Sequence, residues 1–120
     1  MSAANGFDNA KAMSAGWLAM RLGIGSARVD VMRRGGELFG VRPPGRQEYV
    51  YPAWQFGRDG RVRPIVPRII ERARSAGIRD DRLNEILNMR LGLGSDRRVV
   101  DLVVEGDEAG VVRAIQNAGA

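Results

Sequence analysis

The chain has 120 residues, 44% of them hydrophobic, and a formal net charge of +5. This length suits one ordinary domain or two very small subdomains, and the apolar content argues against a disordered chain. The sequence contains no cysteine and no histidine, which excludes disulfides, thiolate chemistry and the commonest general base and metal ligand.

The charge is unevenly distributed along the sequence. Residues 21–79 carry 13 arginines against 5 acidic residues, whereas residues 80–120 carry 5 arginines against 8 acidic residues. This split predicts a first part that suits a polyanion and a second part with another role. No run approaches roughly 18 uncharged apolar residues, and the first residues lack a secretory signal pattern. We therefore expect a cytoplasmic protein with no membrane contact.

The first predicted elements are two short helices. Residues 1–10 are small and polar, and we expect them to be flexible. A helical pattern begins near Lys11, and Gly23 ends it. Gly25-Ser26 then offers an N-cap for a second helix that runs from about Ala27 to Arg34, with Val29 and Met32 facing inward.

A β-hairpin is predicted next. The runs "ELFGV" and "QEYVYP" are rich in apolar, aromatic and β-branched residues, and "RPPGR" between them supplies a turn of proline and glycine. Tyr49 and Tyr51 would share one face. The sequence thus predicts a basic hairpin directly after the second helix.

The second half reads as helical. Ile65, Ile69, Ile70 and Ala73 line one face of a helix, and Asp80 or Asp81 would cap the next one. Residues 97–105 fit a helix, but "VVDLVVE" leans toward strand by local propensity, so both remain open. Gly106-Asp107 breaks the chain and caps a last helix. The predicted fold class is mainly α with a small β-hairpin. A winged helix-turn-helix occupies residues 11–60, and a helical dimerisation or partner-binding region occupies residues 61–120.

The two short helices match a helix-turn-helix. Ala19 is the small residue at the crossing, Gly23 provides the turn, and Ile24 and Val29 are apolar positions after it. The second helix and the hairpin tip would present the residues that contact DNA, by base readout and by phosphate contact. These predicted DNA-binding residues are Ser26, Ala27, Arg28, Arg33, Arg34, Arg42 and Arg46.

The order of these motifs resembles two known families. "WLAMRLGIGSARVDVMRRGGELFGVR" is similar to the winged helix-turn-helix of MerR and excisionase type. "YVYPAWQFGRDGRVRPIVPRII" resembles a motif that often follows this module in small bacterial proteins. "LGLGSDRRVVDLVVEGDEAGVVRAI" is similar to the toxin-binding domain of Xre/MbcA/ParS-type antitoxins. The resemblance implies DNA binding in the first part and, in the second, a possible toxin-like protein partner.

Other candidate residues fit structural roles. Trp17 and Trp54 suit a core, and Gln55 suits a hydrogen bond to the backbone near the hairpin. Asp80-Asp81 and Asp107-Glu108 lie at expected helix starts, where carboxylates cap helices, so no metal or cofactor is predicted. The serines have no histidine partner, and no catalytic residue is predicted.

A partner interface is predicted in the acidic half. If residues 97–105 are helical, their valines and leucine cover more of the circumference than one core face needs. Part of this surface would meet another chain, most simply in a homodimer, although a fully buried central helix would explain it equally well. The predicted interface residues are Val99, Val100, Leu102, Val103 and Val104.

The sequence therefore favours a small DNA-binding protein, either a transcriptional regulator or an antitoxin-like protein, without enzymatic activity. The alternative is a protein-interaction module that neutralises a partner through its C-terminal half. In that case DNA binding would be secondary or absent.

Overall fold

The structure, a computed structural model, describes residues 11–119, so the segment 1–10 that was predicted to be flexible lies outside it. The chain divides into two compact units, Met1–Arg63 and Pro64–Ala120, here called unit 1 and unit 2. The sequence predicts a boundary between the two parts after residue 60, three residues before the boundary in the structure. The predicted fold class, mainly α with a small antiparallel β element, is confirmed. Among the described residues, no helix combines the length and the apolar character needed to cross a membrane.

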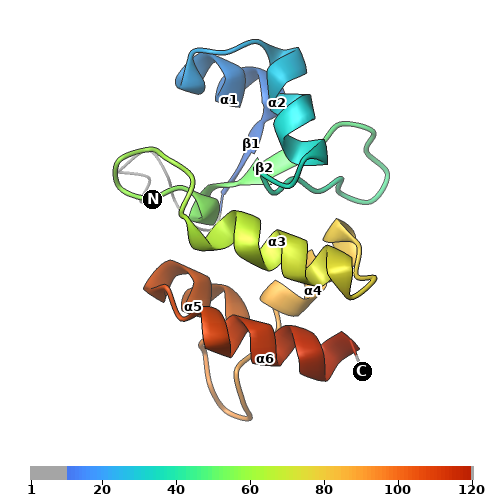
Figure 1. The fold of residues 1–120 in the computed structure, drawn as a ribbon, viewed down its shortest axis with the longest axis vertical. Coiled ribbons are helices and arrows are strands. Elements are labelled where there is room, and N and C mark those ends of the chain that lie inside the picture. Colours follow the sequence, from blue (N-terminus) through green and yellow to red (C-terminus); the bar gives the residue numbers. More distant parts are fainter. Residues whose placement is uncertain (1–10, 120) are drawn as a thin grey trace. The chain divides into compact units, whose positions relative to one another are not determined.

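Unit 1 combines two helices with a two-stranded sheet (Figure 1). Its elements are β1 (Ala12–Ser14), α1 (Ala15–Leu22), α2 (Ser26–Arg34), β2 (Val50–Pro52) and the 3-10 turn η1 (Ala53–Gln55). A buried cluster joins both helices to β2 and the segments beside it. Its members are Leu18, Ala19, Val29, Leu38, Tyr51 and Phe56.

The start of α1 differs from the prediction. The helix begins at Ala15 rather than near Lys11, because the Ser14 hydroxyl accepts a hydrogen bond from the Trp17 amide at 3.1 Å and caps it. The residues before this cap form β1, which sequence periodicity had assigned to the helix. Three residues of strand carry too little pattern to be distinguished from one turn of helix.

The predicted hairpin is also different in its pairing. The predicted pairing is reduced to one antiparallel bridge between Val41 and Val50 of β2, and the regular partner of β2 is β1, with Met13 opposite Tyr51 (Figure 1). Pro43 and Pro44 lack amide hydrogens, so the ladder cannot continue beyond Val41 toward the tip. The wing is therefore a loop anchored by one bridge. Its tip turns at Pro43–Arg46, where the Arg46 amide donates to the Pro43 carbonyl at 3.0 Å.

Gln55 ties the segments of unit 1 together. Its fully buried side chain accepts a hydrogen bond from the Phe39 amide at 2.8 Å. It also donates to the carbonyls of Phe39 at 2.8 Å and Pro52 at 3.0 Å. The predicted backbone role of Gln55 is confirmed. Trp54 is buried as predicted, and its ring contacts that of Phe39 with centroids 5.5 Å apart.

Unit 2 is a group of four helices: α3 (Ile65–Ser75), α4 (Asp80–Leu87), α5 (Val99–Glu105) and α6 (Glu108–Gly119). Helix α6 packs against the other three, and α4 also packs against α3 and α5. The open question about residues 97–105 is resolved in favour of a helix. Its valines are β-formers, but Val99, Leu102 and Val103 are buried, and tertiary packing outweighs local propensity.

Acidic residues hold the starts of three helices in unit 2. Asp107 accepts from the Gly110 amide at 3.0 Å, which confirms its predicted capping role, and Asp101 accepts from the Arg98 amide at 2.8 Å. The prediction for α4 is wrong in detail, because Arg79 is the N-cap. Asp80 and Asp81 occupy the first turn, where they complement the helix dipole, and Asp80 pairs with Arg74 at 2.9 Å.

Candidate nucleic-acid interface

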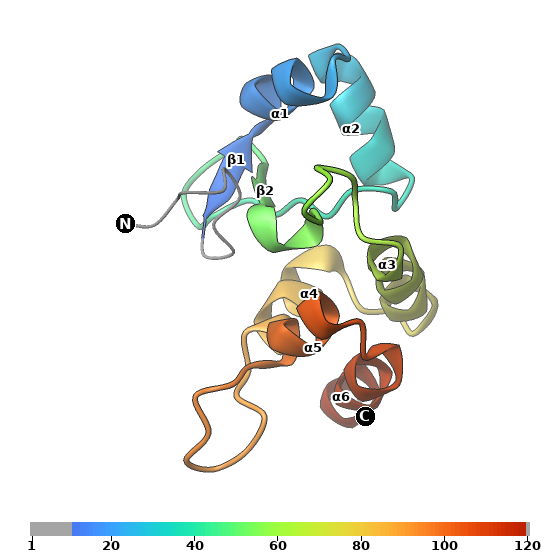
Figure 2. The same cartoon turned by 90° about the vertical axis from the view of Figure 1, so that its left-hand side faces the viewer.

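A tight glycine turn sets α1 and α2 against each other. Gly23 has a φ of +71°, a left-handed conformation that glycine adopts without strain, and its amide donates to the Met20 carbonyl at 3.3 Å. The next amide, that of Ile24, donates to the Ala19 carbonyl at 3.0 Å. Figure 2 shows the resulting helix, short turn and second helix. This is the arrangement that the spacing of Ala19, Gly23 and Ile24 predicts.

The first turn of α2 is exposed. Ser26, Ala27 and Arg28 all lie at the surface, whereas Val29 is fully buried against the core of unit 1. Arg28 forms no ion pair with any residue in the described part of the chain. The first turn therefore combines two short side chains, one available guanidinium group and the positive end of a helix dipole.

The end of α2 carries its cations differently. The Arg33 side chain is only 12% exposed and pairs with Asp30 one turn earlier. Its guanidinium carbon lies 3.6 Å from the centroid of the Tyr49 ring. The structure does not favour the predicted DNA contact of Arg33, because burial, a carboxylate and an aromatic ring already occupy its guanidinium group. Helical spacing is consistent with the pair of Asp30 and Arg33, three positions apart, but it could not predict the contact with Tyr49, which comes from a distant segment.

Hydrogen bonds and burial around Arg33 shift the pKa values of Asp30, Arg33 and Tyr51. The hydrogen bond from Arg33 lowers the pKa of Asp30 below its ordinary value of 3.8. Burial raises the pKa of Tyr51. Burial alone would lower the pKa of Arg33, but hydrogen bonds to Asp30 and Tyr51 outweigh it and raise the pKa. The cluster of Asp30, Arg33, Tyr49 and Tyr51 thus fixes the end of α2 against the segment that carries β2.

The other predicted arginines remain accessible. Arg34 shares Asp30 at 3.0 Å, yet 64% of its side chain is exposed. Arg42 and Arg46 lie exposed on the wing loop, where Arg42 approaches the Tyr49 ring at 5.3 Å. Tyr49 therefore contacts both Arg33 of α2 and Arg42 of the loop. This shared ring connects the base of the wing loop to the helix.

An exposed apolar pair on α1 contradicts one prediction. Trp17 was predicted to belong to the core, but it is 41% exposed, and Met20 on the next turn is 76% exposed. The Arg21 guanidinium lies 6.0 Å from the centroid of the Trp17 ring. The buried residues of this helix are Leu18 and Ala19. An eight-residue helix with apolar side chains on most positions does not reveal by periodicity which of them face inward.

The predicted partner interface is mostly core. Val99, Leu102 and Val103 are buried, and Val100 and Val104 are partly buried. The first three are therefore not available to a partner in this structure. The buried-helix interpretation explains most of the apolar circumference of α5.

Comparison with known proteins supports the fold. No family model matches the chain, and no curated protein matches it. Among solved structures, the NMR structure of Rv2175c superposes with a TM-score of 0.76 over 93% of this chain and 83% of that chain. The two sequences are 24% identical over the match. The likeness shows that the two chains share a fold.

Proposed function

We propose that this chain is a small, cytoplasmic, non-enzymatic DNA-binding protein that inserts the first turn of α2 into the major groove of duplex DNA. The observation that carries this proposal is the exposed sequence Ser26-Ala27-Arg28 at the start of the second helix of a helix-turn-helix. Short side chains permit a close approach of the backbone, and arginine can donate two hydrogen bonds to a guanine edge.

The charge distribution supports the same unit as the DNA-binding part. Residues 1–63 contain ten lysine and arginine residues against five acidic ones, whereas residues 64–120 contain nine of each. The entire net charge of the chain therefore lies in unit 1. Phosphate contacts dominate the affinity of proteins for DNA, so we expect a polyanion such as DNA to bind to unit 1 rather than to unit 2.

Each arginine of the predicted site receives a separate role. Arg28 reads the groove, and Arg42 and Arg46 on the wing loop contact phosphates beside it. Arg34 adds a phosphate contact at the end of α2. Arg33 is a positioning residue, because it holds α2 on Tyr49 and does not face solvent. These DNA-contact roles follow, by analogy, from the resemblance of the sequence to winged helices of MerR and excisionase type.

The test is binding of the full-length protein to fluorescent duplexes, measured by anisotropy across a salt series. One duplex carries the upstream region of the protein's own gene, and the other carries the same bases in scrambled order. We expect Arg28→Ala to weaken binding to the upstream duplex by about tenfold or more, since one base contact is worth roughly 1–3 kcal/mol.

The matched control is Arg72→Ala, which removes an exposed arginine from α3 in unit 2. It changes the net charge equally and should leave DNA affinity nearly unchanged. Equal weakening of DNA binding by both substitutions would show that the loss of one positive charge, and not the position of Arg28, explains the lower affinity. Wild-type affinity in Arg28→Ala, or no binding of either duplex at low salt, would refute the proposal.

We also propose that two copies bind together, because a twofold pair places two such helices on successive turns of DNA. The burial of Val99, Leu102 and Val103 removes α5 as the expected dimer surface. Light scattering of the free protein and of its DNA complex measures the stoichiometry. One copy per duplex at saturation would contradict this part of the proposal.

A further inference from the structure

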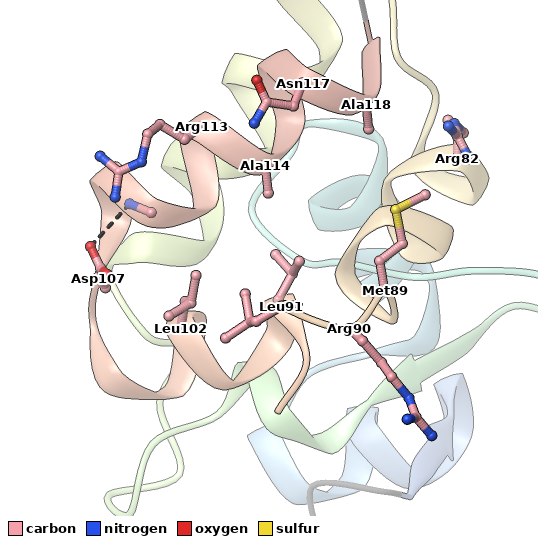
Figure 3. Close-up of a pocket in the computed structure, with 12 residues that line it drawn as sticks. Arg82, Met89, Arg90, Leu91, Leu102, Asp107, Arg113, Ala114, Asn117 and Ala118 are labelled. Atoms are coloured by element: carbon pink, nitrogen blue, oxygen red, sulfur yellow. Dashed lines mark hydrogen bonds between the residues drawn. The ribbon is translucent and has the colours of Figure 1, made fainter. Parts of the chain in front are cut away.

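Unit 2 contains an open pocket between its last three helices. Its volume is about 580 Å³, and its walls come from α4, α5, α6 and residues 89–91 (Figure 3). Leu91, Leu102 and Ala114 lie at its centre. These three apolar side chains form the floor of the pocket. Leu102 comes from α5, Ala114 from α6, and Leu91 from the segment that follows α4.

An exposed apolar edge adjoins this pocket. Met89 is 40% exposed and Leu91 is 37% exposed, and both line the pocket. Leu93, two residues further, is fully exposed. Of the six large apolar side chains that are strongly exposed in residues 11–119, these three lie within five consecutive positions. Apolar surface concentrated in this way marks a contact site more often than isolated exposed residues do.

Arginines frame the apolar floor. Figure 3 shows Arg113 at the end near Asp107, and Arg82 and Arg90 at the opposite end. Arg82 forms an ion pair with Glu85 at 2.9 Å, and Asp107 accepts a hydrogen bond from the Gly110 amide. Arg90 and Arg113 form no ion pair with another residue of the described chain. The rim thus has two cations without a carboxylate partner, and its one carboxylate, Asp107, lies at the end of α6 that Arg113 occupies.

We propose that this pocket binds an amphipathic helix of another protein, with apolar side chains on the floor and acidic residues against Arg90 and Arg113. The three helices that line the pocket satisfy their own peptide groups, so recognition here depends on side chains and not on strand addition. Apolar anchors at helical spacing, flanked by carboxylates, match both the floor and the rim.

Charge disfavours a second copy of this chain as the occupant. A twofold pair through this pocket would bring Arg82, Arg90 and Arg113 of both copies together. Like charges in an interface oppose association, whereas an acidic partner removes the repulsion. The pocket shares no residue with the proposed DNA contact, since all of its residues belong to unit 2.

The experiment selects peptides of about 16 residues, roughly four helical turns, from a displayed random library against the full-length protein. Selected peptides are synthesised with a fluorophore, and their affinities are measured by anisotropy. The variants are Arg90→Glu/Arg113→Glu for the rim and Leu91→Ser for the floor. Arg72→Glu/Arg79→Glu is the matched charge control in unit 2, since both arginines are exposed and neither lines the pocket, and Arg28→Ala is the control for the DNA site. Circular dichroism verifies that each variant is folded.

We expect selected peptides to combine Asp or Glu with Leu, Ile or Phe repeated every three or four positions. Their affinity should fall about tenfold or more in the rim variant and several-fold in the floor variant, and should be unchanged in both controls. Equal binding to the rim variant, selection of basic peptides or failure to select any binder would overturn the proposal. Loss of binding in Arg28→Ala alone would assign the acidic peptides to unit 1. Dimerisation of the free protein that Leu91→Ser abolishes would assign the pocket to a second copy and overturn the proposal.

Discussion

Arginines with similar sequence surroundings have different roles in this protein. Arg28 and Arg33 are five positions apart on α2, and the sequence predicts both as DNA contacts. The structure leaves Arg28 exposed and places Arg33 on the Tyr49 ring beside Asp30. Asp30, three residues before Arg33, and the return of the chain through residues 49–51 both distinguish Arg33 from Arg28, and no local pattern encodes that return. Gln55 is the opposite case, because a polar residue amid aromatic ones predicts a buried hydrogen-bonding role.

Replacing Gln55 tests how much one buried side chain stabilises unit 1. We expect Gln55→Ala to lower the free energy of unfolding by about 2–4 kcal/mol, because three hydrogen bonds are lost and the peptide groups of Phe39 are left buried without them. Urea unfolding followed by tryptophan fluorescence measures the change. The control is Gln47→Ala, on the exposed wing loop, which should change stability by less than about 0.5 kcal/mol.

Replacing Asp30 tests the ion pairs at the end of α2. Since the folded pKa of Asp30 is lowered, its stabilising effect is present above its ordinary pKa of 3.8 and is lost as pH falls through the lower folded value. We therefore expect Asp30→Asn to melt at a lower temperature than the wild type at neutral pH. The difference should shrink as the pH falls below about 3.8, the ordinary value.

Differential scanning fluorimetry across pH measures this convergence. The control is Glu48→Gln, which removes an exposed carboxylate of unit 1 that forms no ion pair with the described residues. It should melt close to the wild type throughout. A difference between wild type and Asp30→Asn that stays constant down to the lowest pH would show that the carboxylate charge is not what stabilises α2.

At the scale of elements, glycines and caps were more informative than periodicity. The sequence predicts the α1–α2 turn from Gly23 and the start of α6 from Asp107, and both are confirmed. The boundary between β1 and α1 and the pairing of β2 are not predicted. Residues 12–14 pair with β2, and Val41 of the wing also bridges to Val50. The first pairing depends on tertiary contacts between segments distant in sequence, and the prolines of the loop keep the second to one bridge.

Two glycines of unit 1 should respond oppositely to alanine. Gly23 needs its left-handed conformation, so Gly23→Ala should destabilise unit 1 by about 1 kcal/mol. Gly16 lies inside α1 without a positive φ and with open space at its Cβ position. Gly16→Ala should therefore stabilise by about 0.5 kcal/mol through helix propensity. Chemical denaturation compares the two, and destabilisation by both would show that α1 does not tolerate a side chain at Gly16.

Across the whole molecule, the two structural units differ less in charge than the two parts counted along the sequence. Counting along the sequence placed the basic part at residues 21–79, which includes α3. The structural division at Arg63 leaves unit 2 with equal numbers of positive and negative residues. Several arginines of unit 2 hold its own helices, such as Arg74 on Asp80 and Arg68 on Glu108 at 2.8 Å. The sequence predicts a basic first part, but the residue at which the basic unit ends required the fold.

The excess of positive charge in unit 1 predicts which arginines determine the salt dependence of the proposed DNA binding. Each phosphate contact contributes about 0.9 to the slope of log K against log salt concentration. The double substitution Arg42→Ala/Arg46→Ala on the wing loop should therefore reduce the slope by up to about 2, with weaker binding to both duplexes. Arg72→Ala/Arg79→Ala removes the same charge from unit 2 and should leave the slope nearly unchanged. Equal slopes for the two double variants would mean that the wing loop does not touch the DNA backbone. Binding through α2 would still be measured separately by Arg28→Ala.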